Sequence, residues 1–137
     1  MDDELEIAAG PSVLVVDDND EVRAVVVRHL LRAGYRVIQA SSSRAAIEIL
    51  EGQVPDLVIT DIFMPDGDGF EIINEIRQCG RSVPILVISG GGAAVAGDYL
   101  GVASRLGATT VLSKPFRGQQ LLDAVVLALK AATANAA

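Results

Sequence analysis

The 137-residue sequence contains one cysteine, no tryptophan and few aromatic residues. The single Cys79 cannot form a disulfide within the chain, so we interpret it as a reduced structural thiol. Basic residues are also scarce, because 11 Lys and Arg stand against 18 Asp and Glu and leave a net charge of −7. Nucleic acid is therefore disfavoured as the main partner, since binding to phosphate backbones requires clustered cations.

Long apolar segments are absent too, and none reaches the roughly 20 residues that a membrane-spanning helix needs. The first residues, Met1-Asp2-Asp3-Glu4, lack the basic segment of a secretory signal. The sequence thus predicts a cytoplasmic protein with no membrane insertion. Half of its residues are hydrophobic, which fits one globular domain. We expect that domain over 12–130, between an N-terminal tail over 1–11 and a C-terminal tail over 131–137.

Short apolar runs alternate with amphipathic segments along the chain, and such runs between turn signals are typical of buried parallel strands. Strands are predicted at Val13–Val16, Tyr35–Ala40, Leu57–Ile59, Val83–Ile88 and Val111–Leu112. Five helices are predicted to follow them, beginning at Asn19 or Asp20, after Ser42 or Ser43, after Gly69, between Gly90 and Gly107, and at about Gln119. The first is expected to end near Ala33 and the last near Ala131.

The first predicted helix has one apolar face. We expect Val22, Val26 and Leu30 to face the core with Val25 beside them, and Arg23, Arg28 and Arg32 to point outward.

Strands that alternate with helices indicate an α/β fold, a doubly wound five-stranded parallel sheet with helices on both faces. The flavodoxin-like strand order 2-1-3-4-5 places the ends of the first and third strands side by side. Asp17 and Asp18 follow the first strand and Asp61 follows the third, so these carboxylates should converge. Ser89 and Lys114 follow the two neighbouring strands and should lie beside them.

Three crowded carboxylates cannot all ionise without a compensating cation, and oxygen ligands suit Mg²⁺. An aspartate can also act as a nucleophile towards phosphorus if cations and a hydroxyl stabilise the phosphoryl oxygens. Asp61, Lys114 and Ser89 supply these groups.

The same residues belong to motifs that occur in a recognisable order. They are the pair Asp17-Asp18, Asp61 followed by Met64-Pro65 and Asp68-Gly69, Ser89 after the fourth strand, and Lys114-Pro115-Phe116 after the fifth. From about Ser12 to Leu129 the chain resembles a receiver domain of the two-component response regulators.

The resemblance implies that Asp61 is the phosphoacceptor. It implies that Asp18, Asp61 and the backbone carbonyl of Phe63 bind Mg²⁺ directly, while Asp17 acts mostly through water. Lys114 would contact the phosphoryl group, and the bond between Lys114 and Pro115 would be cis.

Receivers usually carry an aromatic residue three positions before the lysine, but this chain has Val111 there. The resemblance implies that the hydroxyl of Ser89 moves towards the phosphoryl group on activation. We therefore expect Ser89 and the glycine-rich segment Gly90–Ala94 to carry the conformational response in place of the aromatic ring.

Because 137 residues leave no room for a DNA-binding or catalytic module, we expect a stand-alone receiver without an output domain. It would accept a phosphoryl group from a histidine kinase or a histidine phosphotransfer protein and bind an unknown downstream protein. It would not be an enzyme, although it would catalyse its own phosphotransfer and dephosphorylation.

Two alternatives stay open. One is a pseudo-receiver that binds partners without phosphorylation. Another is an aspartyl-phosphate phosphatase, although Asp17-Asp18-Asn19 does not match the Asp-x-Asp motif of those enzymes. The last helix has an apolar stripe wider than one core-facing row, which predicts either deep burial or a protein interface such as a homodimer. The stripe is formed by Leu121, Leu122, Val125, Val126 and Leu129.

Overall fold

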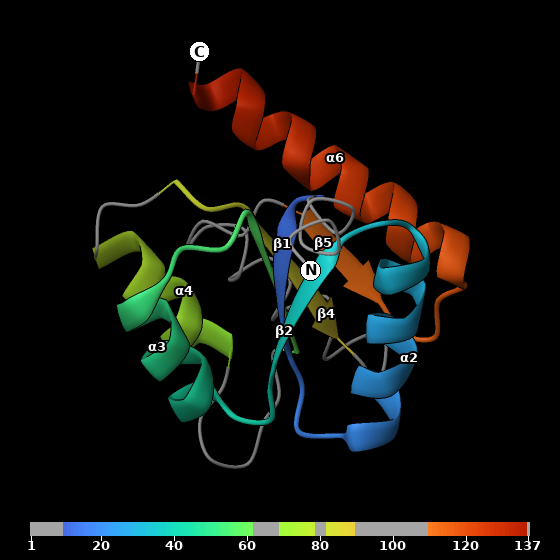
Figure 1. Cartoon of the computed structure of the whole chain (residues 1–137), viewed down its shortest axis with the longest axis horizontal. Coiled ribbons are helices and arrows are strands. Elements are labelled where there is room, and N and C mark those ends of the chain that lie inside the picture. The colour runs from blue at the N-terminus through green and yellow to red at the C-terminus, as the bar shows by residue number, and fades with distance from the viewer. Residues whose placement is uncertain (1–9, 62–68, 79–81, 90–109, 137) are drawn as a thin grey trace, which may run out of the picture.

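The computed structural model describes residues 10–61, 69–78, 82–89 and 110–136 (Figure 1). Five parallel strands form one sheet in the order β2-β1-β3-β4-β5. The strands are β1 (Ser12–Val16), β2 (Arg36–Ala40), β3 (Leu57–Asp61), β4 (Ile85–Ser89) and β5 (Thr110–Ser113). The helices are α2 (Asp20–Arg32), α3 (Ser43–Gly52), α4 (Gly69–Gln78) and α6 (Gly118–Ala136). The predicted doubly wound fold and strand order are confirmed, and the helix predicted between Gly90 and Gly107 lies outside the described residues.

The sheet separates two hydrophobic cores, because successive side chains of a strand point to opposite faces. In β1, Leu14 and Val16 contribute to the core under α3 and α4. Val13 and Val15 contribute to the core under α2 and α6 on the other face. Figure 1 shows these two helix pairs on opposite sides of the sheet. The central strands β1 and β3 are therefore buried on both faces, which explains their continuous apolar sequences.

Local signals set the helix ends. The cap of α2 is Asn19 and not Asp20, because the side chain of Asn19 accepts a hydrogen bond from the Val22 amide at 3.1 Å. Ser42 likewise accepts one from the Ala45 amide at 3.1 Å. After α2 the chain turns at Gly34, whose φ of 94° is a left-handed conformation that favours glycine. The last helix continues to Ala136, beyond the end expected from the sequence.

Helix α2 is rotated relative to the prediction. Val26 and Leu30 are buried as expected, but Val27 is buried as well and Val25 is 41% exposed. The expectation that Arg23 points outward is wrong, because its side chain is only 16% exposed. Helix α2 is therefore rotated so that the side carrying Arg23 faces the sheet.

Helix α6 buries only part of its apolar stripe. Leu121 and Val125 are fully buried, whereas Val126 is 41% exposed and the following Leu127 is 62% exposed. Among the described residues, no helix is long and apolar enough to cross a membrane. The homodimer suggested by this stripe stays a prediction, checked by light scattering.

Helices α2 and α6 meet closely at one point. A side chain built at Gly118, the first residue of α6, would place its Cβ 2.7 Å from Nδ1 of His29 in α2. This separation is shorter than van der Waals contact, so the imidazole ring occupies the space that a side chain at position 118 would need.

The hydroxyl of Ser43 is fully buried at the start of α3 and has no hydrogen-bond partner among the described residues. Burial of an unpaired hydroxyl costs about 1–3 kcal/mol. We therefore expect Ser43→Ala to raise the free energy of unfolding by about 1 kcal/mol in urea titrations. Ser42→Ala is the matched comparison and should lower it by about 1 kcal/mol, since it removes the helix cap. A loss of stability in both variants would mean that the Ser43 hydroxyl is bonded.

Candidate functional site

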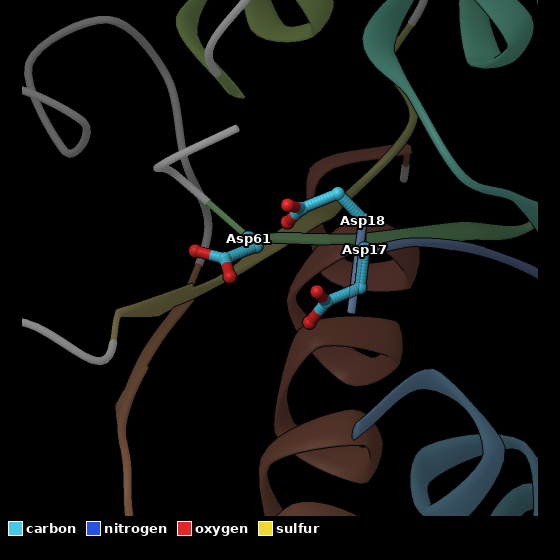
Figure 2. A group of neighbouring side chains, drawn as sticks. All are labelled: Asp17, Asp18 and Asp61. Carbon is cyan, nitrogen blue, oxygen red and sulfur yellow. The ribbon is translucent and has the colours of Figure 1, made fainter. Parts of the chain in front are cut away.

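The register of the sheet brings the predicted aspartates together. Val16 in β1 pairs with Thr60 in β3, so the next residues, Asp17 and Asp61, lie beside each other at the carboxyl edge. One carboxylate oxygen from each of Asp17, Asp18 and Asp61 lies within 4.8 Å of the others. Figure 2 shows the three side chains grouped at the ends of β1 and β3. The predicted convergence of these residues is confirmed.

Asp17 is the most enclosed of the three, with 3% of its surface exposed. Its Oδ1 accepts a hydrogen bond from the Asn19 amide at 2.9 Å. Burial raises the pKa of Asp17, and the nearby charges of Asp61 and Asp18 act in the same direction. The Asn19 amide and the ammonium of Lys114 oppose this rise of the pKa without cancelling it. Without a further cation, the charged form of Asp17 is therefore disfavoured.

Lys114 is shared between two buried carboxylates. Its Nζ donates to Oδ2 of Asp61 at 3.0 Å and lies 3.5 Å from Oδ2 of Asp17. It follows β5 directly, and the Lys114-Pro115 peptide bond is cis, as the resemblance implied. Among the described residues, one ammonium thus faces two carboxylates.

The cluster has an enclosed side and an open side. Asp61 is 7% exposed, and the neighbouring Thr60 hydroxyl donates to the Asp61 backbone carbonyl at 2.9 Å. Asp18, by contrast, is exposed to solvent. Among the described residues, the cluster is therefore open to solvent on the Asp18 side and enclosed around Asp61.

The donor set fits a hard divalent cation. Oxygens bound to one Mg²⁺ lie at about 2.0–2.1 Å from the ion, so they are at most about 4.2 Å apart. The 4.8 Å spread of the three carboxylates comes close to this limit. A small movement of the side chains, which the exposed Asp18 permits, would bring them within it.

The other predicted site residues are described only in part. Ser89 is the last residue of β4, the strand beside β3, and it pairs with Ser113 of β5. Its side chain lies outside the described residues. Phe63 and the segment Gly90–Ala94 also lie outside them. Val111 is in β5 as predicted, and 37% of its surface is exposed.

Sequence reasoning missed one residue beside the cluster, Arg23. Its guanidinium donates to the backbone carbonyl of Asp17 at 2.6 Å, to Oδ1 of Asp20 at 2.6 Å and to Oε1 of Gln39 at 3.2 Å. The spacing of Asp20 and Arg23 by three residues, which suits an ion pair on a helix, was a signal that could have been used.

Comparison with known proteins identifies the family. The family model described as the response regulator receiver domain matches residues 13–126. The chain belongs to this family. Receiver domains are signalling modules of two-component systems, and they bind Mg²⁺ at an acidic pocket. In this receiver, Asp17, Asp18 and Asp61 form a carboxylate cluster that could hold a metal ion.

Relatives differ in how much of their length the receiver covers. The transcriptional regulatory protein AfsQ1 of Streptomyces coelicolor is 33% identical over 87% of this chain and 51% of its own length. Sporulation initiation phosphotransferase F of Bacillus subtilis is 29% identical over 82% of this chain and 89% of its own length. The chain spans about half the length of the first curated relatives that it matches.

Solved structures agree with the fold. The chemotaxis protein CheY4 of Vibrio cholerae superimposes with a TM-score of 0.78 at 30% identity, covering 87% of this chain and 98% of that one. A response regulator from Chloroflexus aurantiacus gives a TM-score of 0.80 at 31% identity, over 88% of this chain and 98% of that one. The receiver fold is thus shared over nearly the whole of both neighbours.

The enclosed carboxylate of the receiver should reduce its stability when no metal is bound. We expect Asp17→Asn to raise the free energy of unfolding in chelator at neutral pH by on the order of 1 kcal/mol, because it removes a charge that burial disfavours. Asp123→Asn, on the exposed side of α6, is the matched control and should change little.

The gain should depend on pH. Since the pKa of Asp17 is raised on folding, protonation favours the folded state. The destabilisation is complete above the folded-state pKa and disappears as the pH falls below the ordinary value of 3.8. Urea titrations at neutral and acidic pH should therefore show the advantage of Asp17→Asn shrinking as the pH falls, and a constant advantage would contradict this explanation.

Proposed function

We propose that Asp61 accepts a phosphoryl group from a phosphohistidine on a histidine kinase or a histidine phosphotransfer protein in the cytoplasm. The observation that carries the proposal is the contact between the nearly buried Asp61 carboxylate and Lys114, at 3.0 Å, inside a cluster of three aspartates. A nucleophile, a cation for phosphoryl oxygens and oxygen ligands for a metal are thereby combined at one strand edge.

In the proposed transfer, a carboxylate oxygen of Asp61 attacks phosphorus while the phosphorus–nitrogen bond of the donor breaks. The electron pair of that bond stays on the imidazole nitrogen, and Asp61 becomes an acyl phosphate. Lys114 already contacts Oδ2 of Asp61, so a small movement lets its ammonium contact the new phosphoryl oxygens. Later attack of water on the same phosphorus would return Asp61 to its free form.

Asp18, Asp61 and the backbone carbonyl of Phe63 are proposed to hold Mg²⁺, with Asp17 acting mostly through water. When bound, the ion neutralises the charge that develops on the phosphoryl oxygens. The raised pKa of Asp17 and the three carboxylates that share one ammonium among the described residues support this assignment, because a bound cation would stabilise the charged carboxylates.

The output of this receiver is proposed to be a change in affinity for a downstream protein, with the Ser89 hydroxyl helping to convert phosphorylation into that change. Ser89 supports this role by its place at the end of β4, next to the strand that carries Asp61. The stand-alone arrangement expected from the sequence stays a prediction.

A phosphotransfer assay tests the proposal. The wild-type chain should incorporate label from acetyl phosphate or a phosphorylated histidine kinase in the presence of Mg²⁺, and the label should be released by alkali, as expected of an acyl phosphate. Binding of Mg²⁺ without any incorporation would favour the pseudo-receiver alternative. Incorporation of a label that mild alkali does not release would point to a hydroxyl or imidazole acceptor instead of Asp61.

A further inference from the structure

The side chain of Asp18 must take up one orientation to bind a metal, but packing does not impose that orientation. Asp18 is exposed to solvent. A carboxylate that binds a metal loses affinity if it must first be ordered, since that ordering costs conformational entropy. Hydrogen bonds of the peptide groups on either side of Asp18 can supply part of that ordering.

Both peptide groups that flank Asp18 are fixed by hydrogen bonds. The amide of Asn19, which follows it, donates to Oδ1 of Asp17 at 2.9 Å. The carbonyl of Asp17, which precedes it, accepts from Arg23 at 2.6 Å. These two bonds restrict rotation on both sides of the Asp18 Cα.

Arg23 is itself held by two further elements of the fold. Its Nε donates to Gln39 of β2 at 3.2 Å, and another nitrogen donates to Asp20 in the first turn of α2 at 2.6 Å. The side chain is 16% exposed, in contrast to the exposed Arg28 on the same helix. A planar guanidinium can serve three acceptors at once in this way, and an ammonium on a flexible stem cannot do so with the same geometry.

We infer that Arg23 is a positioning residue for the metal site, which fixes the Asp17-Asp18 peptide group against β2 and α2 and thereby orients the Asp18 carboxylate. The inference rests on the proposed role of Asp18 as a magnesium ligand. Residues that orient metal ligands typically contribute 10–100-fold to metal affinity.

Because Arg23 is charged, a positioning role can be distinguished from a simple electrostatic effect on Mg²⁺ affinity. A guanidinium close to the cluster repels a divalent cation, so removing the charge alone would strengthen Mg²⁺ binding. Removing a positioning contact would weaken it. The two explanations therefore predict opposite signs for the same substitution.

The experiment is calorimetric titration of the full chain with Mg²⁺, without a phosphodonor. Arg23→Gln and Arg23→Lys should each weaken Mg²⁺ binding about tenfold or more. Arg28→Gln, which removes the same charge from an exposed position of α2, should leave the affinity nearly unchanged. Saturating Mg²⁺ should restore the phosphorylation of both Arg23 variants, since Asp61 and Lys114 are untouched.

Several results would overturn the inference. Tighter binding in Arg23→Gln with no change in Arg23→Lys would mean that Arg23 acts by its charge. Unchanged affinity with a lower melting temperature would mean that it only stabilises the fold. If both variants fail to fold, Gln39→Ala, which removes one contact of Arg23 without changing the net charge, should still weaken binding, and an unchanged affinity there would equally overturn it.

The same titration separates this inference from the proposed function. Wild-type chain that does not bind Mg²⁺ would remove the metal site itself. Wild-type chain that binds Mg²⁺ and is phosphorylated, with Arg23 variants of equal affinity, would leave the proposed function intact and reject the role of Arg23.

Discussion

Asp61→Asn is expected to abolish phosphorylation, so that no label from acetyl phosphate or a phosphorylated kinase remains above background. The amide has nearly the shape of the carboxylate and fits the same buried position, but it is a poor nucleophile and forms no acyl phosphate. The substitution also reduces the number of like charges in the cluster, so the fold should persist. Intact-protein mass spectrometry after incubation with donor and Mg²⁺ measures the result directly.

A control variant makes the result specific. Asp123→Asn changes an exposed carboxylate of α6, which accepts a hydrogen bond from Gln119, and should be phosphorylated like the wild type. Undiminished labelling of Asp61→Asn would show that another group is the acceptor. Peptide mapping would then show whether the label is on Asp17, on Asp18 or on a hydroxyl.

Removal of Mg²⁺ is expected to have an effect of similar size. Chelator should reduce phosphorylation to background, because Lys114 alone cannot balance three carboxylates and an incoming phosphoryl group. Added Mg²⁺ should also stabilise the folded state, by about 2.7 kcal/mol at a concentration 100 times the dissociation constant. Thermal melts with and without Mg²⁺ measure this second effect as a rise of several degrees.

Asp18→Ala should weaken both effects of Mg²⁺, since it removes the ligand on the open side of the site. Glu21→Ala removes a nearby exposed carboxylate that is not in the cluster and should preserve both. A melting temperature that millimolar Mg²⁺ does not change, together with full phosphorylation in chelator, would contradict the roles proposed for Asp18 and Asp61.

The arrangement of the aspartates could be predicted because it depends on few features of the chain. Apolar runs define the strands, helices between them make the strands parallel, and the strand order then decides which ends are neighbours. Val16 of β1 pairs with Thr60 of β3, and Asp17 and Asp61 are the residues that follow them. The two aspartates are therefore neighbours whatever the details of side-chain packing.

The orientation of α2 could not be predicted in the same way. Val25, Val26 and Val27 are consecutive, so the apolar face fits more than one rotation of the helix. Packing against the sheet and α6 selects the rotation that buries Val26 and Val27 and turns Arg23 inward. Periodicity alone contains no information about that choice, and the contacts of Arg23 were missed for this reason.

Serine positions show a similar limit. Ser42 and Ser43 are equally good helix caps by composition, and only the path of the chain decides between them. Once Ser42 accepts the bond from Ala45, Ser43 occupies the first helical position and its hydroxyl is buried. An unpaired buried hydroxyl depends on packing and leaves no pattern in the sequence.

The close approach of His29 and Gly118 has a consequence for how this chain can change over evolutionary time. The imidazole ring lies where any side chain at position 118 would be, so the two positions share one volume. A larger residue at position 118 requires the His29 ring to rotate away or a smaller residue to replace it. Substitutions at the two positions should therefore be coupled in lineages of this receiver.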